Sequence, residues 1–588
     1  MPTLFEAINK LSVDQIKALI ALLPAGRLTG KKPELVDTLY RAYEGDGARV
    51  LWERLDELEQ AALADAIYYS RGRIDLRRVK AKFGRTPPFS SGREHYTDKP
   101  TRIRLFFYYD QDGAYALPLD LVERLKTFVP QPERDQVRVL ETIPESIGEE
   151  PVSVRATESE ALADLPFILR LTEQGKLRVS DKTRLPGAAT LKLLAAQCVN
   201  GDYYPEAPKV EKGELELGPI KAFGWPLLLQ AGGLAQESGG KLVLSKSGVK
   251  ALRGAPADVL RELWAQWLKS TRFDEFSRVD AIKGQRSKGR VMTAVPPRRA
   301  AIAEALRCCP VGEWIETAEL GRFMRAEGID FEVTHDPWKL YIFDPNYGSL
   351  GYQGFHDWNI LQFSYLLALL FEYAAPLGLI DIAYIMPEDA RGDYCELWGS
   401  EDLRFLTRYD GLMYFRLTEL GAYCLGLRPD YTPSRPKSSL RLAVLPSLQV
   451  NVVAGKVAAD EVLLLDTWAT RVAETGWVLD RTKSVAAIEK GHDIATLLDL
   501  LCAGDDQPLP ETVEAFAKLV REQGAALKTV ATALLIKCAN AEIARQISEH
   551  PETKQLCLLA GDCHLTVRIE HEAKFRAVVH VLGFGWLV

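Results

Sequence analysis

Two histidine–aspartate pairs carry the residue types best suited to metal-dependent hydrolysis. They are His335-Asp336 and His356-Asp357. Imidazole nitrogens and carboxylate oxygens bind divalent metals, which activate water for attack on a phosphodiester. A metal-dependent nuclease is therefore one hypothesis. The same stretch is rich in turn-forming Gly, Pro and Asn, so an ordered loop packed on a helix at 358–375 is the simpler interpretation.

Aromatic residues crowd the same segment. They are Trp338, Tyr341, Phe343, Tyr347, Tyr352, Phe355 and Trp358. Rings that face solvent stack on unpaired bases, which gives an alternative interpretation, contact with single-stranded DNA. The sequence leaves the structural and the functional interpretations of this segment open.

Other catalytic or metal-binding patterns are incomplete. Cys557, Cys563, His564 and His571 have the residue types of a zinc site, but such sites usually contain two closely spaced pairs of ligands. The string from Gly26 to Lys32 resembles a phosphate-binding loop with three residues between its glycines instead of four. Its last residue is lysine where Ser or Thr would bind Mg²⁺. We therefore expect no metal, no cofactor and no ATP hydrolysis by this chain.

Composition restricts the class of protein. The chain has 588 residues, of which 47% are hydrophobic, and its net charge is −7. Such a length predicts roughly three to five domains. A negative chain does not coat DNA as a whole, so any DNA contact must come from local basic patches. The nine cysteines show no disulfide spacing, and neither a signal peptide nor a membrane span is recognisable, so we expect a cytoplasmic protein without a membrane partner.

Basic residues cluster in three places. Lys31 and Lys32 stand at an expected helix start, where free N–H groups attract anions. Between residues 71 and 85 the only acid is Asp75, and the basic residues are Arg71, Arg73, Arg77, Arg78, Lys80, Lys82 and Arg85. Between residues 278 and 299 the only acid is Asp280, and the basic residues are Arg278, Lys283, Arg286, Lys288, Arg290, Arg298 and Arg299.

The third cluster is interrupted by Gly284, Gly289 and a proline pair, which predicts an exposed basic linker able to contact phosphates without reading sequence. Each cluster also has a simpler interpretation. Lys31 and Lys32 can be solvated on a two-helix cap, residues 71–85 can form an ordinary charged helix face, and residues 278–299 can simply join two domains.

The expected secondary structure is mostly helical, with short hairpins. An amphipathic helix capped at Ser12 or Asp14 precedes a second helix that follows Leu28-Thr-Gly-Lys-Lys, an order that resembles a SAP-type DNA-binding module. From 57 to 130 the pattern is two helices, a hairpin at Asp110–Gly113 and a helix, which resembles a winged helix.

Two stretches, 240–252 and 413–426, resemble each other. Each has an apolar strand, a Ser or Thr cap, and a helix with a glycine for close packing, Gly248 or Gly421. Both are typical of the closing strand and helix of a winged-helix domain. The apolar end at 578–588 predicts either a final strand or a patch where a partner docks.

A family resemblance covers about the last quarter of the chain. Its motifs are RLAVLPSLQVNVVAG, then WVLDRTKSVAAIEKG, then PLPETV. The key positions are Leu479, Asp480, Ser484, Gly491, Pro508, Pro510 and Val513. This order resembles the accessory domain that precedes the ATPase core in XPB-type helicases. The resemblance implies a helicase-associated α/β domain, here without a motor.

These observations predict a mainly α fold with small β wings, made of tandem winged-helix-like units and a C-terminal α/β domain. The expected parts are 1–50 SAP-like, 51–135 winged-helix-like, 136–276 winged-helix-like units, 277–299 basic linker, 300–430 winged-helix-like with an aromatic insertion, and 440–588 helicase-accessory-like, after a proline-rich linker at 428–439.

The predicted function is that of a non-catalytic DNA-binding subunit, or partner of a separate motor ATPase, in DNA repair or phage defence. The alternatives are a protein–protein scaffold built of winged helices and the metal-dependent nuclease. Fold-level resemblance is weak support for any of these functions.

Overall fold

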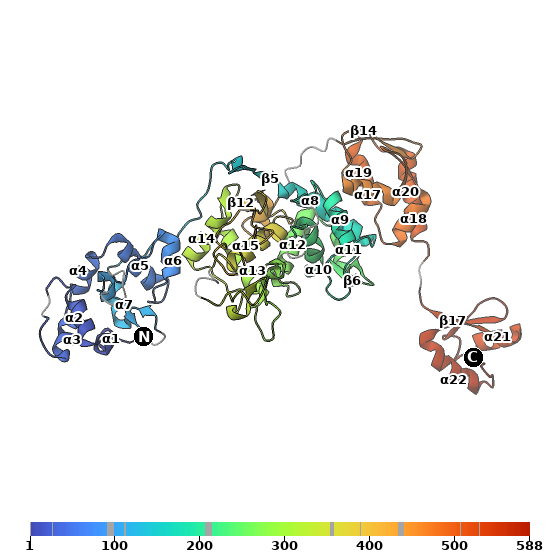
Figure 1. Ribbon diagram of the computed structural model, residues 1–588. Helices are drawn as coiled ribbons and strands as arrows, with labels where there is room; N and C mark the ends of the chain where they lie inside the picture. Colours follow the sequence, from blue (N-terminus) through green and yellow to red (C-terminus); the bar gives the residue numbers. More distant parts are fainter. Residues whose placement is uncertain are drawn as a thin grey trace. The chain divides into compact units, whose positions relative to one another are not determined.

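A computed structural model describes residues 2–25, 28–90, 99–110, 113–205, 215–352, 358–388, 390–432, 440–505, 507–527 and 530–587. The described chain combines twenty-two α-helices with small sheets whose paired strands are all antiparallel (Figure 1). The described chain is thus mixed α/β, with many helices and small antiparallel sheets, and the expected mainly α fold of tandem winged-helix-like units stays a prediction. Within the described residues no helix is both long and apolar enough to cross a bilayer.

Two compact units make up the chain, Met1–Arg435 and Pro436–Val588. The division falls within the expected linker at 428–439, of which 433–439 lie outside the described residues.

The first part of unit 1 is an amino-terminal lobe, residues 2–132, with its own hydrophobic core. Its elements are α1 (Leu4–Lys10), α2 (Val13–Ile20), α3 (Lys32–Arg41), α4 (Gly47–Glu53), α5 (Glu57–Tyr68), α6 (Leu76–Phe83), η1 (Arg102–Leu105), β1 (Tyr108–Tyr109), β2 (Tyr115–Ala116) and α7 (Leu119–Leu125). Side chains from 4 to 129 share the core, so the boundary expected near residue 50 falls inside it.

Local signals explain where these helices begin and end. Ser12 caps α2 in a capping box with Gln15, and α6 ends at Gly84, whose φ of 75° is left-handed. The expected order of helices and hairpin from 57 to 130 is present, although residues 111–112 of the turn lie outside the described residues. The strand expected from Ile103 begins only at Tyr108, because residues 102–105 form a 3₁₀ turn.

The rest of unit 1 is a middle lobe, residues 133–432. Its helices are α8 (Thr157–Glu173), α9 (Ala188–Gln197), α10 (Lys221–Ala231), α11 (Lys246–Ala251), α12 (Pro256–Lys269), η2 (Glu275–Arg278), α13 (Val295–Arg307), α14 (Thr317–Glu327), η3 (Pro337–Lys339), α15 (Gln362–Leu369), the π-helical η4 (Leu370–Ala374) and α16 (Glu419–Cys424).

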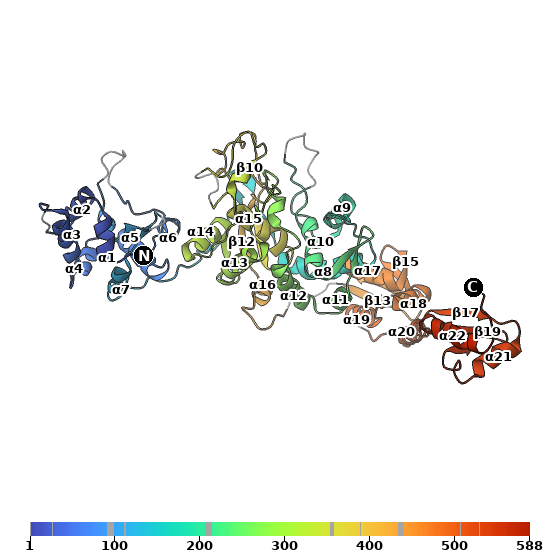
Figure 2. The ribbon, with the colours of Figure 1, turned by 90° about the horizontal axis from the view of Figure 1, so that it is seen from below.

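The main sheet of this lobe has the strand order β5 (Ser153–Arg155), β11 (Ile380–Tyr384), β12 (Leu412–Leu417), β9 (Trp314–Glu316). Three two-stranded ribbons accompany it. They pair β3 (Ser146–Ile147) with β4 (Glu150–Pro151), β6 (Ala235–Ser238) with β7 (Lys241–Leu244), and β8 (Ile282–Lys283) with β10 (Tyr341–Ile342). Figure 2 shows β10 at the edge of the lobe, beyond α15.

The resemblance between residues 240–252 and 413–426 is confirmed as strand, cap and helix. Ser245 accepts a hydrogen bond from the Gly248 amide, and Thr418 accepts one from the Gly421 amide. A Cβ on either glycine would collide with a backbone carbonyl of the preceding segment. Both glycines are therefore required by close packing, as the sequence predicted.

Unit 2 contains two hydrophobic clusters, each with its own sheet. The first has strand order β13 (Arg441–Val444), β14 (Gln449–Ala454), β16 (Gly476–Leu479), β15 (Ala469–Ala473), and its helices are α17 (Ala459–Trp468), α18 (Arg481–Glu489), α19 (Ala495–Gly504) and α20 (Glu511–Gly524). The second has strand order β17 (Ala533–Lys537), β19 (His564–Arg568), β18 (Cys557–Leu559), with α21 (Ala541–Glu549), η5 (Ile569–His571) and α22 (Glu572–Val581).

The residues that carry the helicase resemblance have clear structural roles in unit 2. Asp480 caps α18, the Ser484 hydroxyl donates to the Trp468 carbonyl at 3.0 Å, and Pro510 precedes the first turn of α20. The final strand expected at 578–588 is wrong, because α22 continues to Val581 and no strand follows it up to residue 587.

Arginines neutralise carboxylates in the centre of the middle lobe. The α15–η4 helix is buried except at Phe363, and Tyr365 on it donates a 2.7 Å hydrogen bond to the buried Glu275. The Arg299 Nε donates to the other carboxylate oxygen of Glu275 at 2.7 Å. Farther along this helix, Glu372 accepts from Arg278 and from Tyr409.

Replacing Arg299 by alanine is expected to lower the free energy of unfolding by about 3–5 kcal/mol, because Glu275 would remain buried without its cation. Urea denaturation followed by circular dichroism measures this change. Arg290→Ala, at an exposed arginine of the same segment, is the control and should change it by less than about 0.5 kcal/mol. Equal effects of the two variants would contradict the structural role of Arg299.

Candidate nucleic-acid interface

A short loop emerges from the middle lobe between two fixed points; we call residues 283–290 the basic loop. At one end Lys283 pairs with Tyr341 in the β8–β10 ribbon. At the other end the His335 amide donates to the Val291 carbonyl at 2.7 Å. Gly284 has a φ of 85°, and a Cβ there would collide with the Lys339 carbonyl. The loop therefore lies directly against residues 335–341.

Four cations of the basic loop are exposed: Lys283, Arg286, Lys288 and Arg290. Among the described residues, none of the four forms an ion pair. The only acid between residues 278 and 299, Asp280, is paired with Arg408. A cleft of about 500 Å³ beside the loop is lined by Lys283, Arg286 and Phe343. The loop thus presents positive charge that the described protein does not neutralise.

The arginines that flank the basic loop are used inside the protein. Arg298 pairs with Asp274 at 2.9 Å and donates to the Thr293 hydroxyl and the Val333 carbonyl. Arg299 is fully buried and pairs with Glu275. The expectation of an exposed linker over 277–299 is therefore wrong at its ends, where η2 and α13 hold these side chains in the core.

On α6 the basic residues divide between two faces. Arg78 and Lys82, four residues apart, both bind Asp65 at 3.0 Å and lie over the Tyr69 ring. Both side chains are engaged below the surface, which weakens the prediction that they bind DNA. Arg77 and Lys80 lie on another face and are exposed.

Of the remaining basic residues between 71 and 85, Arg71 and Arg85 are exposed, and Arg73 pairs with Asp110 at 2.7 Å. The α6 helix also packs against α14, as both ribbon views show, and Arg322 of α14 donates to the Ala81 carbonyl (Figures 1 and 2). The predicted recognition helix is therefore partly covered.

At the start of α3 a carboxylate already occupies the expected anion site. The Glu34 side chain accepts from the Lys31 amide at 3.4 Å and lies next to Gly30. Lys31 is exposed and Lys32 is half-buried, while Gly26 lies outside the described residues. A phosphate here would have to displace Glu34, which weakens the prediction for these two lysines.

Three exposed aromatic side chains stand beside the basic loop; we call Trp338, Tyr352 and Trp398 the aromatic row. Their exposed fractions are 59%, 45% and 48%. The Tyr352 ring centroid lies 5.1 Å from the centroid of each tryptophan, in edge-to-face geometry. The sequence drew attention to two of these residues but missed Trp398, which comes from a segment some fifty residues farther along the chain.

Among the described residues we find no metal-binding site that would support the nuclease hypothesis. Asp336 is paired with Lys339 at 3.1 Å, while Phe355 and the second pair, His356-Asp357, lie outside the described residues. No group of three or more His, Cys, Asp or Glu side chains suited to a metal occurs in the part of the chain that is described. Burial raises the pKa of Cys557 to about 11, which disfavours the thiolate that binds zinc.

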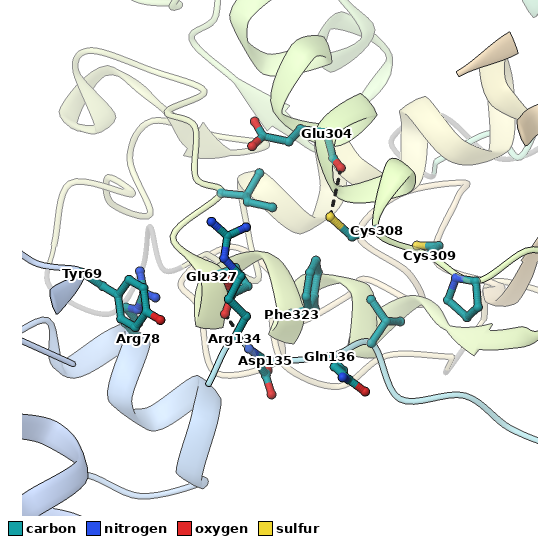
Figure 3. Close-up of a pocket in the computed structure, with 13 residues that line it drawn as sticks. Tyr69, Arg78, Arg134, Asp135, Gln136, Glu304, Cys308, Cys309, Phe323 and Glu327 are labelled. Carbon is teal, nitrogen blue, oxygen red and sulfur yellow. Dashed lines mark hydrogen bonds between the residues drawn. The ribbon is translucent and has the colours of Figure 1, made fainter. Parts of the chain in front are cut away.

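A cavity of about 520 Å³ lies where the amino-terminal lobe meets α13 and α14 (Figure 3). Figure 3 shows Tyr69 and Arg78 on one side and Cys308, Phe323 and Glu327 on the other. Burial and the nearby Glu304 and Glu327 raise the pKa of Cys308. The described lining contains no histidine that could activate this thiol for catalysis. We therefore interpret the cavity as a gap where the two lobes pack against each other.

Comparison with known proteins adds no assignment: no family model matches the chain, and a search of curated proteins finds no similar sequence.

Proposed function

We propose that this chain is a non-catalytic DNA-binding subunit. The observation that carries the proposal is the basic loop: four exposed cations without ion-pair partners among the described residues, in a chain whose net charge is −7. Exposed cations bind phosphates mainly by releasing condensed counterions, and this needs no sequence readout.

The fixed ends of the basic loop support the same proposal. Arg278 and Arg299, one at each flank, are anchored on buried carboxylates, and the backbone at the two ends of the loop, residues 282–283 and 291–292, pairs with residues 334–342. A loop held in place loses less conformational entropy on binding than a free basic tail does. Arg77 and Lys80 on α6 offer a further, smaller basic surface in the same unit.

Association with a motor ATPase, and a place in DNA repair or phage defence, are further parts of the proposal. They rest on the resemblance of residues 440–588 to the XPB-type accessory domain. The order of strand, capped helix and proline-initiated helix in unit 2 is compatible with that resemblance.

Neutralising the basic loop is expected to weaken DNA binding and to reduce its salt dependence. The variant changes all four cations to glutamine: Lys283, Arg286, Lys288 and Arg290. For every phosphate that the variant no longer binds, the slope of log K against log salt should fall by roughly 0.9. Fluorescence anisotropy with labelled duplex DNA over a series of salt concentrations measures both quantities.

A second variant with the same change in net charge serves as the control. It converts four exposed lysines elsewhere in the middle lobe to glutamine: Lys182, Lys192, Lys246 and Lys250. If affinity falls equally in both variants, the effect is one of overall charge, and the basic loop is not the DNA-binding site.

One observation favours a second function, protein docking through unit 2. Leu535 of β17 and Leu558 of β18 both pair with Thr566 of the central strand β19, so the three form a row across the sheet. The leucines are 68% and 73% exposed, whereas α21 and α22 pack on this sheet through buried side chains such as Ala544 and Phe575. An exposed apolar row of this kind is typical of an interaction surface.

Replacing Leu535 and Leu558 by glutamate is expected to abolish capture of a motor ATPase, because the two introduced charges would be desolvated on docking. The affinity of the chain for DNA should stay unchanged. Affinity purification of the full chain from its source cells, with mass-spectrometric identification, compares the double variant with the unchanged chain. Capture of a motor by both proteins would place docking elsewhere. Capture of no motor by either would reject the helicase-partner proposal.

A further inference from the structure

We propose that the aromatic row is a base-stacking platform for single-stranded nucleic acid, with the basic loop holding the phosphates of the same strand. This inference rests on the proposed DNA-binding function and adds the form of nucleic acid. It assigns a role to Trp338, Tyr352 and Trp398, which lie far apart in the sequence and meet only in the folded middle lobe.

Two glycines lie directly against the indoles of the two tryptophans of the row. A Cβ on Gly351 would overlap the indole of Trp338, and a Cβ on Gly348 would overlap the indole of Trp398. Each indole therefore lies directly on backbone at one side, and about half of its surface faces solvent. Rings held in this way lose little conformational freedom on binding, which favours their use as binding surfaces.

Hydrogen bonds fix the backbone under the rings. The Ser349 hydroxyl donates to the Trp338 carbonyl at 2.7 Å, and the Leu350 amide donates to the Leu340 carbonyl at 2.8 Å. These bonds bring the 348–351 turn against the 338–340 segment. The row is thus part of the ordered structure of the lobe.

The basic loop is close enough to serve the same strand. A Cβ built on Gly289 would lie 3.4 Å from the Lys339 Nζ, and Lys339 directly follows Trp338. At the other end of the loop, Lys283 Nζ lies 5.7 Å from the centroid of the Phe343 ring. Cations beside exposed rings are the combination that binds phosphates and stacks bases in single-strand binding proteins.

Two carboxylates close to Trp338 in the sequence make local contacts. Asp336 is paired with Lys339, and Asp344 accepts a 2.9 Å hydrogen bond from the Asn346 amide inside a turn. Asp336 therefore has a cation partner, whereas Asp344 keeps its charge, and Glu396, Glu401 and Asp402 near Trp398 in the sequence are exposed.

Single strands fit this surface better than a duplex or an apolar protein face does. Bases in a duplex are stacked on one another and offer their edges in the grooves, so a row of ring faces gains little from them. An apolar protein partner would have to desolvate the neighbouring cations without neutralising them. Unpaired bases joined by phosphates supply both a stacking partner and a counter-charge.

The test compares oligo(dT) with a duplex of the same length, using the full chain at fixed salt. Changing Trp338 and Trp398 to alanine should weaken oligo(dT) binding by roughly 5- to 100-fold per ring, as expected when one base no longer stacks. Duplex affinity should stay unchanged. Phe5→Ala, at an exposed ring on α1, is the control and should change neither affinity.

Two further variants distinguish a loss of stacking from a general loss of the fold. Gly351→Ala keeps every aromatic ring but should displace Trp338, so it should also weaken oligo(dT) binding selectively. Trp338→Phe should bind oligo(dT) more tightly than Trp338→Ala does, because a smaller ring still stacks. Circular dichroism of each variant verifies the fold.

The outcomes separate this inference from the proposed function. If the glutamine variant of the basic loop loses oligo(dT) and duplex alike while the tryptophan variants bind both normally, the chain binds DNA and the stacking platform is rejected. If neither set of variants alters binding, the DNA-binding role of this surface is rejected as well. Equal loss of duplex and oligo(dT) affinity in the tryptophan variants would assign the row to duplex binding instead.

Discussion

The middle lobe is organised around arginines that neutralise carboxylates inside its core. Glu275 is fully buried, and burial raises its pKa while the adjacent Arg299 opposes that rise. Tyr365 and Arg299 together satisfy both carboxylate oxygens. Burying charges is costly, so such a cluster tolerates few alternative arrangements of η2, α13 and α15. Its main contribution is then to fix the position of these elements relative to one another.

That constraint determines which basic residues can reach a ligand. Arg278 and Arg299 lie at the two ends of a strongly basic stretch, and their guanidinium groups are used on Glu372 and Glu275. The eight residues of the basic loop between these anchors lie against residues 335–341, and their cations face solvent. The same residue type has two opposite roles within one segment: buried arginines build the lobe, and exposed ones are available to phosphates.

Local features of the fold could be predicted from sequence, whereas burial of the charged residues could not. The caps at Ser12, Ser245 and Thr418 depend on neighbours three residues away, so their sequence context contains the whole interaction. Arg299, by contrast, is buried because Glu275 and the Trp267 carbonyl come from elements well before it in the chain. A count of charges along a segment contains no information about such partners. On α6 the spacing did contain a usable signal, because Arg78 and Lys82 are four residues apart on the one helix face that meets Asp65 of α5.

The aromatic row illustrates a different limit. Gly348 and Gly351 could be recognised from sequence as turn residues, but the contact of Gly348 with an indole depends on Trp398, which follows it by some fifty residues. An exposed tryptophan whose ring did not lie against the backbone could change its side-chain conformation and would not hold its ring in one orientation. Because backbone lies directly against these indoles, one methyl group at Gly351 is expected to displace Trp338 while the buried arginine clusters remain intact. In the contacts described for the middle lobe, the exposed cations and the aromatic row are distinct from the arginine–carboxylate pairs of the core, so substitutions in the proposed binding surface leave those pairs in place.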